Sequence, residues 1–303
     1  NQACIGHMLN GQPISCIQSP ETGRELTFSK LKPASKKRKI LIIGGGPAGM
    51  KAATVAASRG HEVKLIEARS MLGGQINLAE RLPGRSEFGG ITTNLANKLQ
   101  RQNVEITLNT EVSADFVMQE APEVVILATG GKSFEPLIDG RENAHVVTAW
   151  QILEGKANVG SRVAIADWRC DWVGLGLAEL LARQGCHVRL ACNGIVPGQT
   201  VNQYVRDNWL GKLHKLNVQT FTHLRLHGID SEDAYFQHTL SGEPVILNDV
   251  DTLVTAFGVG SVNTLEKELK NNFNSNLHVI GDALSPRTVE EAILDGLKAS
   301  TLI

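Results

Sequence analysis

Net charge and long apolar runs are both scarce in this chain of 303 residues. The formal net charge is −1, from 30 basic and 31 acidic side chains, so the sequence lacks the positive field that nucleic-acid binding needs. No apolar run approaches the ~20 residues of a membrane-spanning helix, and no secretory signal is seen. We therefore expect neither nucleic acid nor a membrane among the partners.

Cysteine is also sparse, with five residues scattered along the chain. No Cys-x-x-Cys or Cys-x4-Cys occurs, so the redox thiol pair of an ordinary disulfide reductase is not expected. The nine histidines do not stand at metal-ligand spacing. Scattered cysteines predict a reducing, cytoplasmic location.

What the chain has in quantity is glycine and aliphatic residues. The 30 glycines, 42% hydrophobic residues and 20% charged residues are typical of an α/β protein, and 303 residues suffice for two domains.

The strongest local pattern is a glycine motif. An apolar run, Lys39–Ile43, ends in Gly44-x-Gly46-x-x-Gly49 and passes into an alanine-rich segment, which predicts strand, tight turn and helix. The helix start would offer free N–H groups to a pyrophosphate. Glu67 ends the next apolar run, at the usual spacing for a carboxylate that binds a ribose hydroxyl. The pattern predicts a site for an ADP moiety.

Other glycines follow candidate strands. Gly73 and Gly74 come soon after Glu67 and suggest backbone that lies against a ligand. The apolar strand 123–128 ends in small residues, as at the ligand crevice of an open α/β sheet. Gly281-Asp282 also follows a strand, and by itself an ordinary turn is as good an interpretation.

A second unit repeats the first about 120 residues later, as an internal duplication would. It comprises a strand over 161–167, a helix over 174–184 and a strand over 187–192. Its glycines are not kept, because Arg169, Asp171 and Gly174 fall at the three glycine positions. An aspartate there would repel a pyrophosphate by about 4 kcal/mol per charge pair at ~4 Å. We do not expect a working nicotinamide site.

Two tryptophans flank this altered turn, Trp168 and Trp172. They would either stack on a ligand or plug the vacated site, and the sequence leaves both open.

The glycine motif with Glu67, the strand end at Ala128 and the Gly281-Asp282 pair together resemble flavoproteins of the glutathione reductase type. The stretch 72–84 narrows the resemblance to the C-terminal half of the 2,4-dienoyl-CoA reductase / trimethylamine dehydrogenase family. Members carry an FMN-bearing TIM barrel, a [4Fe-4S] cluster and then this module. The resemblance, which spans essentially the whole chain, implies an α/β fold with two Rossmann-like three-layer dinucleotide-binding domains, the second inserted in the first.

The resemblance also implies the domain limits. Residues 1–35 would be the tail of a missing TIM barrel, 36–148 with 250–303 the FAD- or ADP-binding domain, and 149–249 the degenerate NAD-like domain. Within the first segment, Cys4 and Cys16 would be the last two cluster ligands, with Ser19 in place of the family's asparagine. The first two ligands would precede residue 1, so this chain alone should not hold the cluster.

The family's cofactor contacts carry over to positions that run from the pyrophosphate to the flavin. They are Gly44, Gly46, Pro47, Ala48 and Gly49 (pyrophosphate), Glu67 and Arg69 (ribose), Val112 (adenine), Gly74, Gln75, Ala128, Thr129 and Gly130 (middle), and Gly281 and Asp282 (ribityl chain). A helix that starts near Val289 would point its N-terminus at the flavin. We expect Glu290 and Glu291 at its start to face solvent.

The altered second turn favours the amine dehydrogenase and N-methyl amine demethylase branch, because dienoyl-CoA reductases need NADPH. The chain would then be an electron-transfer half with FAD, or ADP alone, and no catalytic residue of its own. An NAD(P)H-dependent enoate reductase and a structural ADP module remain as alternatives. The implied partners are the missing N-terminal FMN barrel, an electron-transfer flavoprotein and further copies of the chain.

Overall fold

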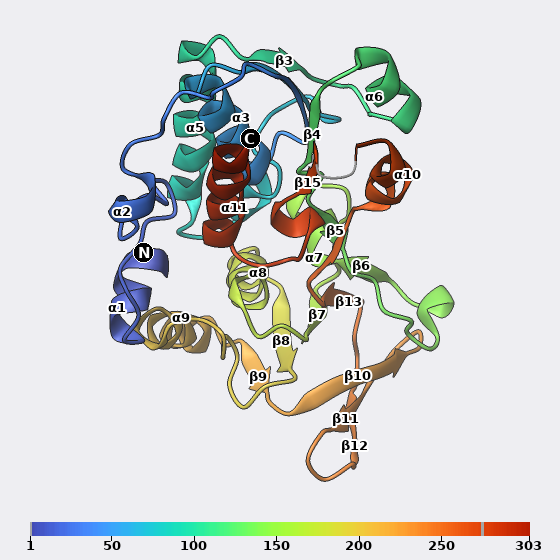
Figure 1. Cartoon of the computed structure of the whole chain (residues 1–303). Coiled ribbons are helices and arrows are strands. Elements are labelled where there is room, and N and C mark those ends of the chain that lie inside the picture. The colour runs from blue at the N-terminus through green and yellow to red at the C-terminus, as the bar shows by residue number, and fades with distance from the viewer. Residues whose placement is uncertain (1, 274–275) are drawn as a thin grey trace. The chain divides into compact units, whose positions relative to one another are not determined.

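The computed structural model describes residues 2–273 and 276–303, so Asn1 of the expected cysteine motif lies outside the described residues (Figure 1). The chain divides into two compact units. The first comprises residues 1–77, 87–132 and 260–303, and the second comprises 78–86 and 133–259.

The first unit is built on a parallel five-stranded sheet in the order β15-β4-β1-β2-β3. Its strands are β1 (Lys39–Ile43), β2 (Glu62–Ile66), β3 (Glu105–Thr107), β4 (Val124–Leu127) and β15 (Leu277–Val279). In the central strand, four of five residues are buried, which is why its sequence is a continuous apolar run. Ile43 at its end lies between Ile66 and Leu127, so the loops that follow these three strands begin side by side.

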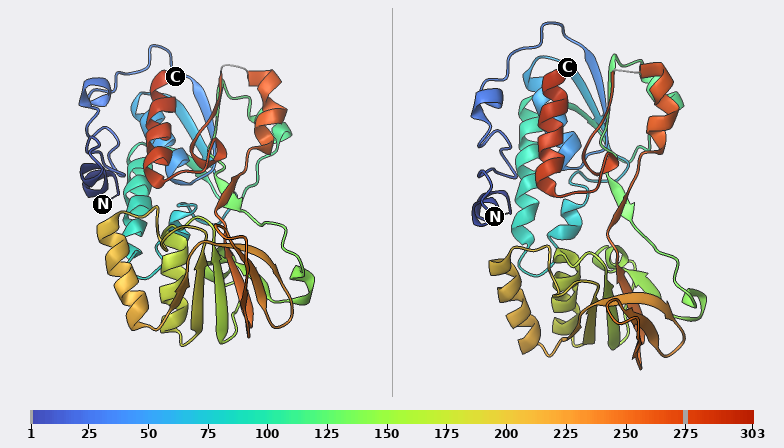
Figure 2. Two further views of the ribbon diagram at one scale, coloured as in Figure 1. Left: turned by 90° about the horizontal axis from the view of Figure 1, so that it is seen from below. Right: turned by 60° about the horizontal axis from the view of Figure 1, so that its bottom comes forward.

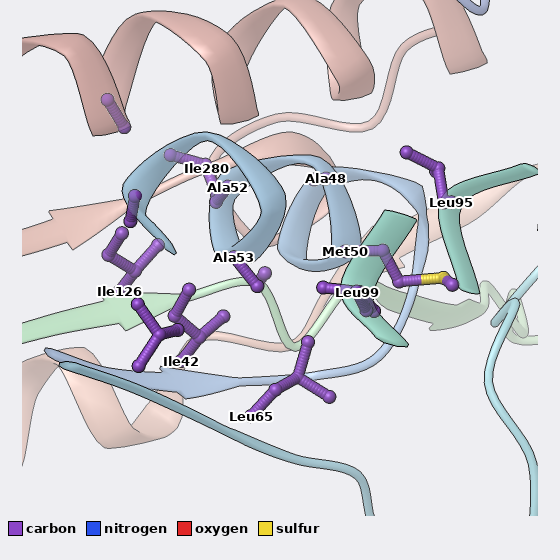
Figure 3. Packing of buried hydrophobic residues seen from close by; sticks show 14 of the residues in the cluster. Ile42, Ala48, Met50, Ala52, Ala53, Leu65, Leu95, Leu99, Ile126 and Ile280 are labelled. Carbon is purple, nitrogen blue, oxygen red and sulfur yellow. The ribbon is translucent and has the colours of Figure 1, made fainter. Parts of the chain in front are cut away.

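Helices cover both faces of this sheet. Alternate strand residues, such as Ile42, pack with α3 (Pro47–Ser58), α5 (Gly89–Arg101) and α11 (Val289–Leu302). Figure 3 shows this core around Met50, and the three helices lie side by side in both views of Figure 2. The residues between, such as Leu41, pack with α6 (Ala114–Glu120) and α10 (Thr264–Phe273).

The second unit repeats this plan on a parallel sheet in the order β6-β13-β7-β8-β9. Its strands are β6 (Val146–Thr148), β7 (Arg162–Asp167), β8 (His187–Cys192), β9 (Gln219–Phe221) and β13 (Thr252–Ala256). One face packs with α7 (Ala149–Leu153), α8 (Trp172–Arg183) and α9 (Gln203–Lys215). The other face packs with an antiparallel sheet of β10 (Leu224–Ile229), β11 (Ala234–His238) and β12 (Pro244–Leu247).

The strands of the second sheet, from β6 to β13, lie between β4 and β15 in the sequence, so the second Rossmann-like unit is inserted in the first. The expected fold class is confirmed. Short elements complete it: α4 (Ile76–Ala79), the 3-10 turns 86–88, 141–143 and 281–283, and the pair β5 (Gly131–Ser133) and β14 (Val259–Ser261).

The structure adds elements that the sequence patterns did not predict. The turn-rich N-terminal segment contains a π-helical turn (Gln2–Gly6), α1 (His7–Leu9) and α2 (Glu25–Phe28). β10 is a further strand that the sequence patterns did not predict. α8 begins at Trp172 rather than at the expected Gly174, because Asp171 caps the helix earlier. In the described part of the chain, no helix is long and apolar enough to cross a membrane.

Candidate dinucleotide site and its degenerate counterpart

The first glycine turn joins β1 to α3, and two of its glycines are needed for packing. Gly44 has a φ of 110°, and a Cβ there would lie 2.2 Å from the carbonyl oxygen of Ala128. A Cβ on Gly49 would lie 2.0 Å from the carbonyl oxygen of Gly44. Since neither contact is possible for another residue, these glycines let the helix start directly against the strand end.

Gly46 differs from these two because its surroundings are open. It is the N-cap of α3 with extended backbone, it has no side chain to cap the helix, and a Cβ there would meet nothing within 4 Å. Pro47 at the first helical position needs no acceptor, whereas the N–H groups of Ala48 and Gly49 do. An uncapped helix start beside open space fits a phosphate group.

Glu67 lies beside this turn at the end of β2. Its carboxylate is 8% exposed and accepts from the Gly45 N–H at 2.6 Å and from the Arg69 N–H at 2.7 Å. Asn109 N–H donates to the Arg69 carbonyl at 3.0 Å, so the loops after β2 and β3 run together. Half-buried Val112 follows in the second of these loops. The structure thus brings Glu67, Arg69 and Val112, which the resemblance assigns to ribose and adenine, into two loops that run together.

The paired glycines after β2 lie on the glycine turn itself. Gly73 N–H donates to the Gly45 carbonyl at 2.9 Å, and Gly74, with a φ of 55°, would place a Cβ 3.1 Å from Gly46 Cα. The sequence predicts that the backbone of Gly73 and Gly74 lies against a ligand. In the structure this backbone contacts the first glycine turn.

Gln75 extends the site to the last strand. Its amide Nε2 donates to Asp282 Oδ2 at 2.8 Å, and a Cβ on Gly281 would come within 2.8 Å of Ala48 Cβ. Three segments that are far apart in the sequence thus meet around the start of α3. Gly281-Asp282 is part of this assembly rather than an isolated turn.

The small residues after β4 lie at the neighbouring strand end. Ala128 N–H donates to the Ile43 carbonyl at 2.8 Å, and Thr129 Oγ1 donates to the Val262 carbonyl at 2.5 Å. Gly130 has a φ of 71°, and a Cβ at this position would have no other atom within 4 Å. The space around Gly130 is therefore open.

The start of α11 corrects one expectation. Glu290 does not face solvent: it is 5% exposed and lies 3.0 Å from His7 Nε2 and 3.6 Å from Arg24 Nη2. The N-terminal segment covers it, which sequence patterns over α11 could not reveal. Glu291 is half-buried and completes a capping box with Thr288.

Cys4 and Cys16 lie in this N-terminal segment, where both are half-buried free thiols. Ser15 N–H donates to the Ala3 carbonyl at 2.8 Å, which ties together the stretches that carry them. Among residues 2–273 and 276–303, no group of three or more metal-ligating side chains gathers. Cys4 and Cys16 therefore do not make a metal site by themselves.

In the second turn, from β7 to α8, two aspartates lie at the start of the helix. Asp171 is the N-cap of α8 and accepts from the Val173 N–H at 2.9 Å, at the position that Gly46 occupies in α3. Asp167 is 1% exposed and accepts from the Cys170 N–H at 2.9 Å, while a Cβ on Gly174 would lie 2.1 Å from its Oδ2. Burial, together with the nearby Asp171, raises the pKa of Asp167 well above its usual range. This helix start is filled.

The two tryptophans of this turn differ in their surroundings. Trp172 packs edge-on against Trp209 at 5.6 Å between ring centroids, and the Arg85 guanidinium lies 3.0 Å from the centre of the Trp172 ring. Trp168 is 42% exposed and stacks on Phe257 at 6.0 Å. Trp172 is therefore engaged inside the unit, and Trp168 presents a partly open ring.

Sequence reasoning missed a pair of buried cysteines at this turn. Cys170 follows β7 and Cys192 ends β8, and both sulfur atoms contact the main chain of Gly194. The signal that could have found them is the parallel register, since Cys192 lies opposite Asp167 at the carboxyl end of the sheet.

Comparison with known proteins agrees with this geometry. Residues 38–285 match the family model described as pyridine nucleotide-disulphide oxidoreductase. The chain is 31% identical to an N,N-dimethylglycine/sarcosine dehydrogenase of Chromohalobacter salexigens and 32% identical to a probable N-methylproline demethylase of Rhizobium meliloti. Each match covers 97% of this chain and 48% of the relative, so the chain spans about half the length of these curated relatives.

A solved structure of a 2-naphthoyl-CoA reductase in complex with 2-naphthoyl-CoA has a similar fold. It superposes with a TM-score of 0.92 at 30% identity, and the match covers 100% of this chain and 46% of the other.

Proposed function

Because the chain belongs to the pyridine nucleotide-disulphide oxidoreductase family, we propose that it is the electron-transfer half of a flavin/iron–sulfur oxidoreductase. It holds FAD, or ADP in its place, at the first glycine turn. The observation that carries the proposal is the contrast between two helix starts: α3 is uncapped beside open space at Gly46, and α8 is capped by Asp171.

Each part of the candidate site has its own task in this proposal. The α3 N–H groups bind the pyrophosphate, and Glu67 accepts from the adenosine ribose. Gln75 and Asp282 orient the remainder of the cofactor. When FAD is bound, its isoalloxazine ring supplies the capacity to accept and pass on electrons. The chain's own residues bind and orient, and none is assigned a proton-transfer step.

For the whole protein we propose oxidation of an N-methyl amine or amino acid, on the likeness to the dimethylglycine/sarcosine dehydrogenase and the N-methylproline demethylase. In this proposal the full-length protein also has an FMN barrel and, beside Cys4 and Cys16, two further cluster cysteines. The domain limits implied by the resemblance, an electron-transfer flavoprotein as acceptor and a homo-oligomeric form belong to the same proposal.

The likeness to the 2-naphthoyl-CoA reductase favours a second candidate, a reductase that draws electrons from NAD(P)H. It requires nucleotide binding in the second unit, where Asp171 already caps the start of α8 and would oppose a dianionic pyrophosphate.

An absorbance spectrum with mass identification of the released cofactor tests these possibilities, followed by anaerobic addition of NADH and NADPH to the full-length protein. Release of FAD, with flavin absorbance near ~450 nm that neither nucleotide bleaches, is the expected result. Bleaching by NADPH would favour the reductase, and ADP without FAD would indicate a structural module.

A further inference from the structure

Two thiols of the second unit are held in one buried pocket at the altered turn. Cys170 is 4% exposed and Cys192 is 0% exposed. Both sulfur atoms contact the main chain of one residue: the Gly194 N–H donates to Cys170 Sγ at 3.2 Å, and Cys192 Sγ lies 3.6 Å from the Gly194 carbonyl oxygen. Cys170 Sγ also lies 3.8 Å from the carbonyl oxygen of Asp167, the residue that pairs with Cys192 in the sheet.

The backbone holds Cys170 in an unusual conformation to reach this position. Its φ is 50°, in the left-handed region, which costs a non-glycine residue free energy and needs support from its surroundings. The support comes from Asp167, which accepts the Cys170 N–H, and from Thr200, which donates from both N–H and Oγ1 to the Cys170 carbonyl at 3.1 and 3.0 Å. The loop is thus fixed with the Cys170 sulfur against the main chain of Gly194, two residues after the end of β8.

We propose that Cys170 and Cys192 form a redox-active dithiol, which a peroxide oxidises to a disulfide. The pair occupies the turn where a working second domain would carry its nucleotide-binding glycines. It does not depend on the function proposed for the first unit.

The chemistry of the pair assigns distinct tasks to the two sulfurs. The neighbouring Cys192 thiol, together with the N–H groups of Gly194 and Asn193, lowers the pKa of Cys170 to about 7 against the opposing effect of burial. The neighbouring Cys170 and burial raise the pKa of Cys192. Cys170 is therefore the attacking thiolate at neutral pH, and Cys192 is the resolving thiol.

The electrons balance in two steps. The Cys170 thiolate attacks one oxygen of hydrogen peroxide, the O–O bond breaks, hydroxide leaves, and Cys170 becomes a sulfenic acid. Cys192 sulfur then attacks Cys170 sulfur, the S–O bond breaks, and the hydroxyl leaves as water with the Cys192 proton. The two thiols lose two electrons in total, and the peroxide gains them.

The sequence provides a matched internal control in Cys186. This half-buried thiol lies near the pair in sequence, but burial raises its pKa, and its sulfur lies 3.6 Å from the Gly160 carbonyl oxygen. Trypsin cuts after Arg169, Arg183, Arg189 and Arg206. The three cysteines therefore fall in separate peptides, 170–183, 184–189 and 190–206.

The experiment treats the full chain at pH 7 with hydrogen peroxide, blocks remaining thiols with iodoacetamide, and maps tryptic peptides without reduction. We expect peptide 170–183 linked to 190–206, two hydrogen atoms lighter than the sum, and released by dithiothreitol. The two reduced peptides should be lost in parallel, at least ~10-fold faster than reduced 184–189. In Cys192→Ser, dimedone should trap a sulfenic acid on Cys170.

Two results would overturn the proposal. One is loss of peptide 184–189 at the same rate as the other two, which would show ordinary thiol oxidation. The other is survival of both reduced peptides while Cys186 is oxidised, which would make the buried pair inert. Because the linkage is measured in the unmodified chain, a folding defect in Cys192→Ser does not affect this decision.

Discussion

Replacing Gly46 by alanine should weaken nucleotide binding and leave the fold almost unchanged. The added Cβ meets no protein atom within 4 Å, and the φ of −75° suits any residue. An alanine N-cap costs the helix at most about 1 kcal/mol relative to glycine. The methyl group projects into the open space where the pyrophosphate would approach the backbone. We expect the affinity for ADP to fall at least ~10-fold, or about 1.4 kcal/mol.

Alanine at Gly49 should instead destabilise the fold and lower the melting temperature. Its Cβ would lie 2.0 Å from the Gly44 carbonyl oxygen, so α3 would have to move away from β1. Alanine gains about 1 kcal/mol of helix propensity, but forcing backbone apart in a packed core costs about 1–3 kcal/mol or more. In a protein of this size each kcal/mol of net loss lowers the melting temperature by about 2–4 °C.

Gly211 supplies a matched control, since it is an exposed glycine in α9 with nothing within 4 Å of its added Cβ. Gly211→Ala should melt at or slightly above the wild-type temperature and bind ADP equally well. Calorimetric titration with ADP and thermal melting of the three variants make the comparison. If Gly46→Ala bound ADP as tightly as the wild type, or if Gly49→Ala melted at the wild-type temperature, the assignment of the turn would be wrong.

Three further substitutions test buried polar groups. Burial raises the pKa of Asp167 in the folded state, so ionisation of this carboxyl destabilises the fold as pH rises from about 4. Asp167→Asn should therefore raise the melting temperature more at pH 7 than at pH 4. Trp209→Phe removes the 2.7 Å hydrogen bond to Glu179, which is 1% exposed, and should cost about 1–3 kcal/mol in denaturant unfolding. Glu290→Gln removes the buried charge that pairs with Arg24, so Ellman's reagent should react faster with the thiols of Cys4 and Cys16. An unchanged reaction rate would show that this ion pair does not hold the N-terminal segment in place.

The first glycine turn could be predicted from the sequence because its requirements are local. Strand, turn and helix follow one another without interruption, and the contact that requires glycine at position 49 is with Gly44 in the same turn. The link to Glu67 needs only the next strand of a parallel sheet, whose spacing is set by the intervening helix. Buried parallel strands are likewise visible as apolar runs.

Other features could not be predicted, because they depend on contacts between distant segments. Glu290 lies one turn before Ile293 and Leu294 on the buried face of α11, yet only the structure shows that His7 and Arg24 of the N-terminal segment pair with it. Segment 78–86 follows β2 of the first unit in sequence, yet Leu82 is part of the second unit's core. The residues of neither segment identify these distant partners.

The sequence by itself determined the two Rossmann-like units and the turn that can hold an ADP moiety, because hydrophobic period and glycine spacing are properties of consecutive residues. Only the tertiary structure decided which side chains lie together at the second turn, where the glycine motif is lost. The register of β7 against β8 places Cys170 beside Cys192 and encloses Asp167 in the core. Burial and proximity, which set the chemistry of thiols and carboxylates, arise when strands pair and not before.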